Sequence, residues 1–274
     1  MGATETEIRI NARRKTGIMS KQYETPLIEL TLGEWVEEME AGPFAQVGYS
    51  DAEWFCILRK KEDRATTGLG QKMTYAQGNI LFDIIKRRHN DPKFCFAMPE
   101  ALWNGEVPVL EGDKVGQYLK SKGITGLRIY ERDIFTDHAA RDAKLWPLIQ
   151  YLRKTPSVII GPHRLRDLVC IGDRVHVPIV TPNLHLKPGE VENAAQAAVE
   201  TLQRDGRRIC LVSAGVSAAV LIDRMWELWP RCVYFDCGSI WDAFVGMGEQ
   251  RQWRADLYST PITHRAWVNI NCGQ

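Results

Sequence analysis

The sequence lacks the cysteine spacing of a zinc site or of a disulfide framework. Its seven cysteines are an odd number, no two of them form a C-x-x-C pair, and most lie inside apolar stretches. Buried thiols of this kind are typical of a reducing compartment, where disulfides rarely persist. We therefore expect reduced cysteines and a cytoplasmic protein.

Two further absences limit the partners. The formal net charge is only +1, so the chain has no global field that would draw it to nucleic acid or to an anionic membrane. No apolar run approaches the length of a membrane span, and residues 1–25 are polar rather than signal-like. Three short basic clusters remain, at residues 12–15, 59–61 and 86–88, and such clusters are typical of helix ends or solvated faces.

What the sequence does contain is an alternation of short apolar runs and helical patterns. The apolar runs predict strands at residues 44–49, 93–99, 157–161, 174–180, 208–214 and 232–236. The helical patterns lie at residues 31–42, 75–89, 139–154, 190–204 and 217–228. Unbroken runs of Val, Ile, Cys and Phe are typical of strands buried on both faces. Their alternation with helices predicts a Rossmann-like α/β fold, a mostly parallel sheet covered by helices.

The same patterns predict the domain organisation. Residues 1–25 lack periodicity and predict a flexible arm, whereas residues 26–274 predict a single α/β domain. Residues 100–136 have the least clear pattern, and we expect them to form an insertion that lines the site. Ligands of parallel sheets bind beyond the carboxyl ends of the strands, so polar residues at four predicted strand ends are the candidate site.

The first of these junctions is VGYSDAEWF, residues 47–55, and it allows two interpretations. Ser50 followed by Glu53 is the pattern of a capping box, and acidic residues in a first turn are favoured by the helix dipole. Alternatively, a strand that ends here delivers Asp51 and Glu53 to the edge of the sheet. Two hard oxygen ligands at that place suit Mg²⁺ or Mn²⁺ carrying a diphosphate.

The second junction carries positive side chains. Gly161 and Pro162 turn the chain, and His163, Arg164 and Arg166 follow. A cationic cluster at the start of a helix opposes the helix dipole, and an anionic ligand is one explanation for it. Arginines that extend into solvent are the other explanation.

The third junction is a tight turn of small residues around Gly215, where amides at the start of a helix could receive a phosphate. The same turn approximates the nucleophile elbow of a serine hydrolase. Ser217 would be the nucleophile, followed in the chain by Asp236 or Asp242 and then by His264. The second elbow glycine is missing, however, and no glycine-rich oxyanion loop precedes the turn.

The fourth junction lies at residues 233–244, where Asp236 ends a predicted strand and Gly238 turns the chain. Ser239 followed three residues later by Asp242 is again a capping pattern. The aspartate at the strand end has no such local explanation, because nothing next to it in the sequence needs its charge.

Taken in order, these junctions resemble the GT-D-type glycosyltransferases, a family first catalogued as a domain of unknown function, whose first motif is R-[FY]-G-D-G-E. The matching stretches are GYSDAEW, VIIGPHRLRDL, IVTPNLHL, VSAGVSAAVLIDRMW and YFDCGSIWD, within about residues 44–245. The D-x-E pair is the most specific of them, and the others match mainly by order and spacing. Ala52 stands where the family has glycine and Val216-Ser217 where it has Pro-Thr, so the chain resembles a divergent member.

The resemblance implies a metal-dependent transferase that moves a sugar from a nucleotide-sugar donor, expected to be a UDP-sugar, to a hydroxyl acceptor. It implies that Asp51 and Glu53 hold Mn²⁺ or Mg²⁺ at the donor phosphates, and that Asp236 or Asp242 deprotonates the acceptor. Positive groups and backbone amides would stabilise the leaving diphosphate. The donor-binding residues expected on this basis are Gly48, Ser50, His163, Arg164, Arg166, Ser213, Ala214, Gly215, Ser217 and Gly238.

The acceptor stays open between two classes. One is a glycan, a peptide or a small molecule; the other is a hydroxymethylated base in DNA, for which the three basic clusters give support. Trp241, Trp253 and Trp267 could stack on sugars or on bases. A serine hydrolase and a non-catalytic module that binds nucleotide sugars or nucleic acid are the alternative functions.

Overall fold

The protein is described here from a computed structural model. The described residues are 28–58, 74–99, 102, 115–125, 127–132, 137–142, 144–180, 184–247 and 252–272. The predicted arm at 1–25 and the basic clusters at 12–15 and 59–61 lie outside the described residues.

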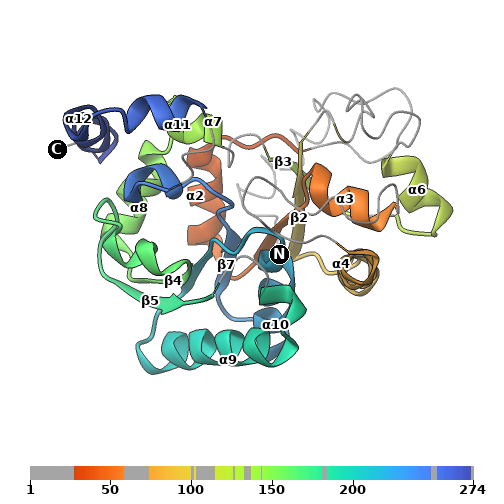
Figure 1. Cartoon of the computed structure of the whole chain (residues 1–274). Coiled ribbons are helices and arrows are strands. Elements are labelled where there is room, and N and C mark those ends of the chain that lie inside the picture. Colours follow the sequence, from red (N-terminus) through yellow and green to blue (C-terminus); the bar gives the residue numbers. More distant parts are fainter. Residues whose placement is uncertain are drawn as a thin grey trace, which may run out of the picture.

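A seven-stranded sheet with the order β3-β2-β1-β7-β6-β4-β5 forms the centre of the molecule, and its strands pair in parallel (Figure 1). The strands are β1 Ala45–Gly48, β2 Phe94–Met98, β3 Ile129–Glu131, β4 Ser157–Gly161, β5 Arg174–Pro178, β6 Ile209–Val212 and β7 Val233–Asp236. Every residue of β1, β2, β4, β6 and β7 is buried, whereas the edge strand β5 is partly exposed. The predicted Rossmann-like parallel sheet is confirmed.

Helices cover both faces of this sheet. They are α2 Leu32–Ala41, α3 Asp51–Ile57, α4 Tyr75–Arg88, α6 Val115–Ser121, α7 Asp137–Arg141, α8 Trp146–Lys154, α9 Pro188–Arg204, α10 Ala218–Leu228, α11 Gln252–Leu257 and α12 Pro261–Cys272. Short 3₁₀ turns are η3 His163–Asp167, η4 Leu184–Leu186, η5 Gly215–Ser217 and η6 Asp242–Val245.

Alternate residues of each strand divide the core into two layers. In β4, Val158 and Ile160 belong to the core cluster that packs against α4, α9 and α10. Ile159, between them, belongs to the cluster on the opposite face, which packs against α2 and α8. Figure 1 shows the two layers, with α9 and α10 below the sheet and α2 and α8 on its other side. A central strand buried in this way needs the unbroken apolar runs seen in the sequence.

Local sequence explains where several helices begin. Thr31 precedes α2, its hydroxyl accepts a hydrogen bond from the Glu34 N–H (3.3 Å), and Glu34 Oε2 accepts one from the Thr31 N–H (2.8 Å). Thr74 caps α4 in a simpler way, accepting from the Gln77 N–H at 3.2 Å. Pro188 occupies the first turn of α9, where its missing N–H costs nothing. The amides that a helix start leaves unpaired are thus satisfied by neighbouring residues.

The structure differs from the predicted elements in three places. The predicted helix 139–154 is two helices, α7 and α8, because Pro147 cannot lie inside a helix and instead occupies the first turn of α8. Residues 100–136, for which no helix or strand was predicted, contain the edge strand β3 and the helix α6. The helices α11 and α12 follow the last predicted element, in a part of the chain without a predicted structure.

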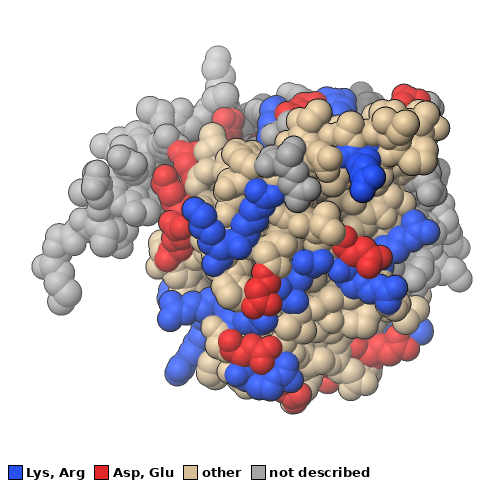
Figure 2. Space-filling view, turned by 90° about the vertical axis from the view of Figure 1, so that its left-hand side faces the viewer, with Lys and Arg blue, Asp and Glu red and all other residues tan. Residues whose placement is uncertain are grey.

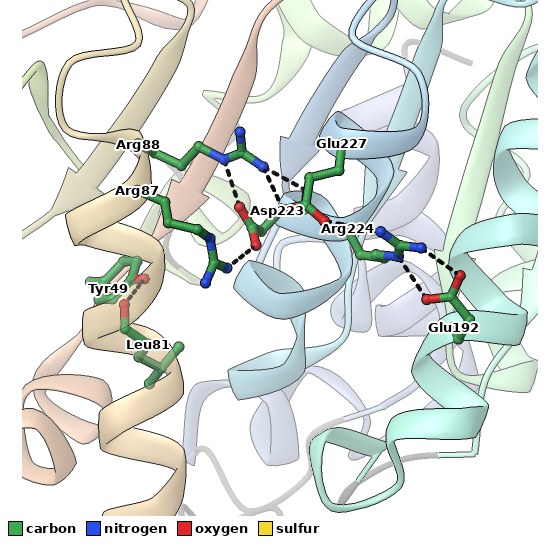
Figure 3. A network of polar contacts seen from close by, with 8 residues as sticks. All are labelled: Tyr49, Leu81, Arg87, Arg88, Glu192, Asp223, Arg224 and Glu227. Carbon is green, nitrogen blue, oxygen red and sulfur yellow. Dashed lines mark hydrogen bonds and ion pairs between the residues drawn. The ribbon is translucent and has the colours of Figure 1, made fainter.

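Arg87 and Arg88 of the basic cluster at residues 86–88 form ion pairs with α10 (Figure 3). Asp223 of α10 is buried and receives Arg87 Nη2 at 2.5 Å and Arg88 Nε at 2.7 Å. Lys86 pairs with Asp83 one turn earlier in α4. The cluster therefore joins α4 to α10 and is not a free patch of positive charge.

Two other expectations can be compared with the structure. All seven cysteines are free and buried, as predicted for reduced thiols. In the part of the chain that the structure describes, none of the helices has both the length and the apolar character needed to cross a membrane.

Candidate functional site

The D-x-E pair lies where β1 ends and α3 begins, and the structure gives its two carboxylates different surroundings. Glu53 is buried, and its Oε2 accepts hydrogen bonds from the Ser50 N–H (2.9 Å) and from the Ser50 hydroxyl. Asp51 is exposed, and its Oδ1 accepts a local hydrogen bond from the Ala52 N–H (2.9 Å). The capping-box interpretation of this stretch is therefore confirmed. It leaves Asp51 facing solvent beside a fixed Glu53.

Asp236 ends β7 next to the end of β1, and its buried carboxylate binds backbone on both sides. Oδ2 accepts a hydrogen bond from the Gly48 N–H (3.0 Å), and Oδ1 accepts one from the Gly238 N–H (2.9 Å). The Asp236 N–H in turn donates to Gln46 Oε1 at 3.0 Å. The carboxylate thus links the end of β1 to the turn after β7, which explains the strand-terminal aspartate that local sequence left unexplained.

The electrostatic surroundings of Asp236 come from several elements. Burial is the main cause that raises its pKa above the ordinary value, and the charge of Glu53 raises it further. Arg132, directly after β3, opposes this rise, with Nη2 3.9 Å from Asp236 Oδ2. Arg132 is a site residue that the sequence analysis missed, because the three-residue strand that delivers it gave no recognisable pattern.

Asp242, the other candidate base, lies in a buried ion pair. Arg254 of α11 is also buried, and its Nη1 donates to Asp242 Oδ2 at 3.1 Å. The same guanidinium donates to the carbonyl oxygens of Met247 (3.2 Å) and Ser239 (3.1 Å). Arg254 was not predicted either, and no spacing within the sequence indicates this contact. The Asp242 carboxylate therefore attaches α11 to the turn that follows β7.

The turn after β6 has the shape expected for close approach to a ligand. Gly215 has φ +53°, a conformation that residues with a Cβ adopt rarely. Ser213 and Ala214, directly before it, are buried, and no described residue is a hydrogen-bond partner of the Ser213 hydroxyl. Ser217 is fully buried, accepts a bond from the His185 N–H (3.1 Å) and lies 3.1 Å from His185 Nδ1. Residues 213–217 thus form the turn that follows β6 and contains η5, and His185 of η4 contacts this turn.

The hydrolase arrangement expected around Ser217 is not assembled. The imidazole beside Ser217 belongs to His185, from the LHL stretch after β5. His264 lies on α12, where its Nε2 contacts the Ala243 carbonyl oxygen at 2.7 Å. Asp236 and Asp242 are engaged as described above, so the Ser–Asp–His264 hypothesis has no geometric support among the described residues.

The cationic junction lies farther along the sheet. His163, Arg164 and Arg166 are exposed in η3 at the carboxyl end of β4. Arg164 Nη1 donates to the Gly246 carbonyl oxygen (2.9 Å), and Arg166 pairs with Asp167 (3.3 Å). Since β7 and β6 separate β4 from β1, a strand spacing of about 4.8 Å places this cluster about 14 Å from the D-x-E pair. The four junctions lie at the carboxyl ends of their strands, and neighbouring junctions contact each other through their backbones, as in the bonds from the Ser213 N–H to the Ile160 carbonyl oxygen (2.8 Å) and from the Cys237 N–H to the Val212 carbonyl oxygen (2.8 Å).

Comparisons with known proteins add information about the fold. No protein-family model matches the sequence, and no curated protein matches it significantly. Among solved structures, one of the highly conserved domain of unknown function 1792, described as having a distinct glycosyltransferase fold, superposes with a TM-score of 0.53 at 14% identity, covering 85% of this chain and 82% of that chain. A structure described as a new glycosyltransferase of the same domain from Streptococcus sanguinis gives 0.53 at 15% identity and covers 85% of each chain.

Identities this low carry information about architecture rather than about activity, and that architecture is the one expected from the ordered motifs. The resemblance to the GT-D-type family is thus confirmed at the level of the fold. The chain has the glycosyltransferase fold of the domain of unknown function 1792.

Proposed function

We propose that this protein is a metal-dependent glycosyltransferase that takes its sugar from a nucleotide-sugar donor, with a UDP-sugar as the first candidate. One observation carries the proposal: in a glycosyltransferase fold, Asp51 and Glu53 follow the carboxyl end of β1, where the Gly48 N–H is hydrogen-bonded to the buried Asp236 of β7. Ligands of parallel sheets bind at this edge.

The two carboxylates fit a metal ion that is shared with a diphosphate. Among the described residues, no group of three or more His, Cys, Asp or Glu side chains could hold a metal ion by itself. The protein would therefore supply at most two carboxylates here, and substrate phosphates and water would complete the coordination, as is common for Mg²⁺. Asp51 would bind the ion directly, and Glu53 would offer the oxygen that Ser50 does not occupy. The ion would neutralise charge on the leaving nucleoside diphosphate.

Of the two candidate bases, the surroundings favour Asp236. The Asp242 carboxylate is already engaged by the buried Arg254, whose Nη1 lies 3.1 Å from Oδ2. Burial raises the pKa of Asp236, and a carboxylate with a raised pKa is the better proton acceptor at neutral pH. Each of its oxygens accepts one backbone N–H and keeps a second lone pair for an acceptor hydroxyl.

For the acceptor we propose a glycan, a peptide or a small molecule in preference to DNA. Residues 86–88 are engaged in ion pairs, which removes one of the three basic clusters on which DNA binding depended. Figure 2 shows acidic and basic side chains interspersed on the face that it draws. Trp241 is fully buried, whereas Trp253 and Trp267 are half-buried and contact each other, with ring centroids 6.2 Å apart. An exposed part of that pair could stack on a sugar ring.

The decisive experiment is calorimetric titration of a panel of nucleoside diphosphates and nucleotide sugars, with Mn²⁺ present and absent. We expect micromolar binding that requires Mn²⁺ and that is lost in Asp51→Ala and in Glu53→Ala. The matched control is Glu34→Ala, which removes the capping-box glutamate of α2 and leaves the D-x-E pair intact.

The control also separates binding from folding. Losing a capping interaction costs about 0.5–2 kcal/mol of stability, so Glu34→Ala and Glu53→Ala should destabilise the fold similarly. Only Glu53→Ala should lose the nucleotide. Binding that survives in both D-x-E variants, or that ignores Mn²⁺, would contradict the proposed site.

A further inference from the structure

Arg132 occupies an unusual position beside the proposed donor site. It follows β3 but reaches the end of β1, two strands away, where its guanidinium lies directly on Gly48. A Cβ placed on Gly48 would come within 2.5 Å of Arg132 Cζ and 2.7 Å of Nε. Any side chain at position 48 would therefore displace the guanidinium, and the absence of a side chain at Gly48 makes room for it.

The charge of this guanidinium is only partly compensated. Nη2 lies 3.9 Å from Asp236 Oδ2, at the limit of an ion pair, and Asp236 already accepts two backbone N–H groups. Nη1 is buried, and no described residue is a hydrogen-bond partner of it. The whole side chain is 14% exposed. A buried cationic donor without an acceptor is unfavourable, so this arrangement indicates that an anionic ligand completes it.

We propose that Arg132 is an anion-binding residue of this site and that it contacts the diphosphate of the donor. Only the identity of the anion rests on the proposed function. A guanidinium presents paired N–H groups that match phosphate oxygens, and with Nη2 held toward Asp236, Nη1 is the group that a phosphate can take. The diphosphate would then be bound by the Arg132 cation as well as by the metal at the D-x-E carboxylates. Gly48 is a positioning residue, because it admits the guanidinium.

The test uses the full chain and four variants. Arg132→Gln removes the charge, Arg132→Lys keeps the charge without the paired donors, and Gly48→Ala displaces the guanidinium while Arg132 stays. The matched control is Arg231→Gln. It removes one positive charge from an exposed position just before β7, at the amino ends of the strands and away from the site at their carboxyl ends. Two probes are titrated by calorimetry: UDP with Mn²⁺, and inorganic pyrophosphate without metal. Circular dichroism and thermal unfolding verify that each variant is folded.

We expect Arg132→Gln to weaken the binding of both probes by about 10- to 100-fold, the usual range for a hydrogen bond to a charged group. Arg132→Lys should be intermediate, Gly48→Ala should resemble Arg132→Gln, and Arg231→Gln should match the wild type. If Arg132→Gln does not fold, Arg132→Lys and Gly48→Ala decide the question.

The outcomes separate this inference from the proposed function. UDP binding that is equal in the wild type, Arg132→Gln and Gly48→Ala would overturn the role of Arg132 and leave the proposed function standing. Pyrophosphate binding that depends on Arg132, without any nucleotide binding, would support the anion site and overturn the nucleotide-sugar proposal. A wild-type protein that binds neither probe would overturn both.

Discussion

Replacing Asp223 with alanine tests whether the 86–88 cluster stabilises the fold or serves a ligand. Asp223 lies on α10 with a side chain that is 7% exposed, and it accepts from Arg87 at 2.5 Å and from Arg88 at 2.7 Å (Figure 3). The substitution leaves two arginines of α4 without their shared carboxylate. If this pairing is structural, the main effect is on the free energy of unfolding.

The magnitude follows from the exposure of the partners. Breaking a fully buried ion pair costs about 3–5 kcal/mol, because one charge stays buried and unpaired. Arg88 is 17% exposed and keeps its ion pair with Glu227 at 3.2 Å, which reduces the cost, whereas Arg87 is 50% exposed and regains water. We therefore expect a loss of about 2–3 kcal/mol, above the range of about 1 kcal/mol or less for an exposed pair. With a shift of about 2–4 °C per kcal/mol for a domain of this class of size, Tm should fall by about 4–12 °C.

Urea and thermal unfolding measure this loss, and the adjacent residue supplies a matched control. Arg224, next to Asp223 on α10, pairs with Glu192 of α9 at 2.7 Å, but the two side chains are 38% and 44% exposed. Arg224→Ala should therefore cost about 1 kcal/mol or less. Equal effects of the two substitutions would refute the reasoning, as would unchanged stability of Asp223→Ala together with stronger binding of duplex DNA at low salt. In the second case the arginines would be available to phosphates.

Three further predictions concern packing, pH and the rival chemistry. Gly78→Ala should destabilise the protein by more than about 1 kcal/mol, because the new Cβ would lie 2.3 Å from the Cys56 carbonyl oxygen. Gly189→Ala, in the open first turn of α9, should be neutral or stabilising by about 0.5–1 kcal/mol. Urea unfolding of both variants measures the difference. Because burial raises the folded-state pKa of Asp236, its contribution to stability is greatest at low pH. That contribution decreases as the pH rises from the ordinary carboxyl pKa through the raised one, and Asp236→Asn should reduce this slope in unfolding measurements at several pH values. A fluorophosphonate probe should leave Ser217 unlabelled, because the residue is fully buried. Covalent labelling of Ser217, detected by mass spectrometry, would support the serine-hydrolase hypothesis.

Most strands of the sheet could be predicted because each of them is an unbroken apolar run in the sequence. The runs at 157–161 and 208–214 contain β4 and β6, which are buried on both faces, and a strand in such a place must be apolar throughout. The exception is β3, whose three residues at the sheet edge are too few for a periodic pattern. Pro147 carried a readable signal, since a proline near the middle of a predicted helix indicates a helix start there.

The site was predictable to the extent that its chemistry is local. The capping box of Ser50 and Glu53 spans four residues, and the sequence showed both it and the carboxylate pair. The capping interpretation is the one that the structure tests: the bond to Ser50 holds Glu53 in place, and Asp51 is exposed. The metal-site interpretation of the same stretch stays a prediction. His185, by contrast, lies in a stretch that matched a family motif, yet its contact with Ser217 joins residues 32 apart and has no local signature.

The contacts that give the site its electrostatic character join residues far apart in the chain. Asp236 and Gly48 are 188 residues apart, and the guanidinium beside them arrives from a third strand, at Arg132. Gly48 was predicted as a donor-binding residue, and in the structure its missing side chain leaves the space that the Arg132 guanidinium fills. The cation and its glycine are therefore one feature, and a substitution at either position should produce the same defect in anion binding. Sequence patterns identify the strand ends at which carboxylates can bind a ligand. The position of the positive charge of Arg132 beside them depends on the order of the strands in the sheet, which is known only from the structure.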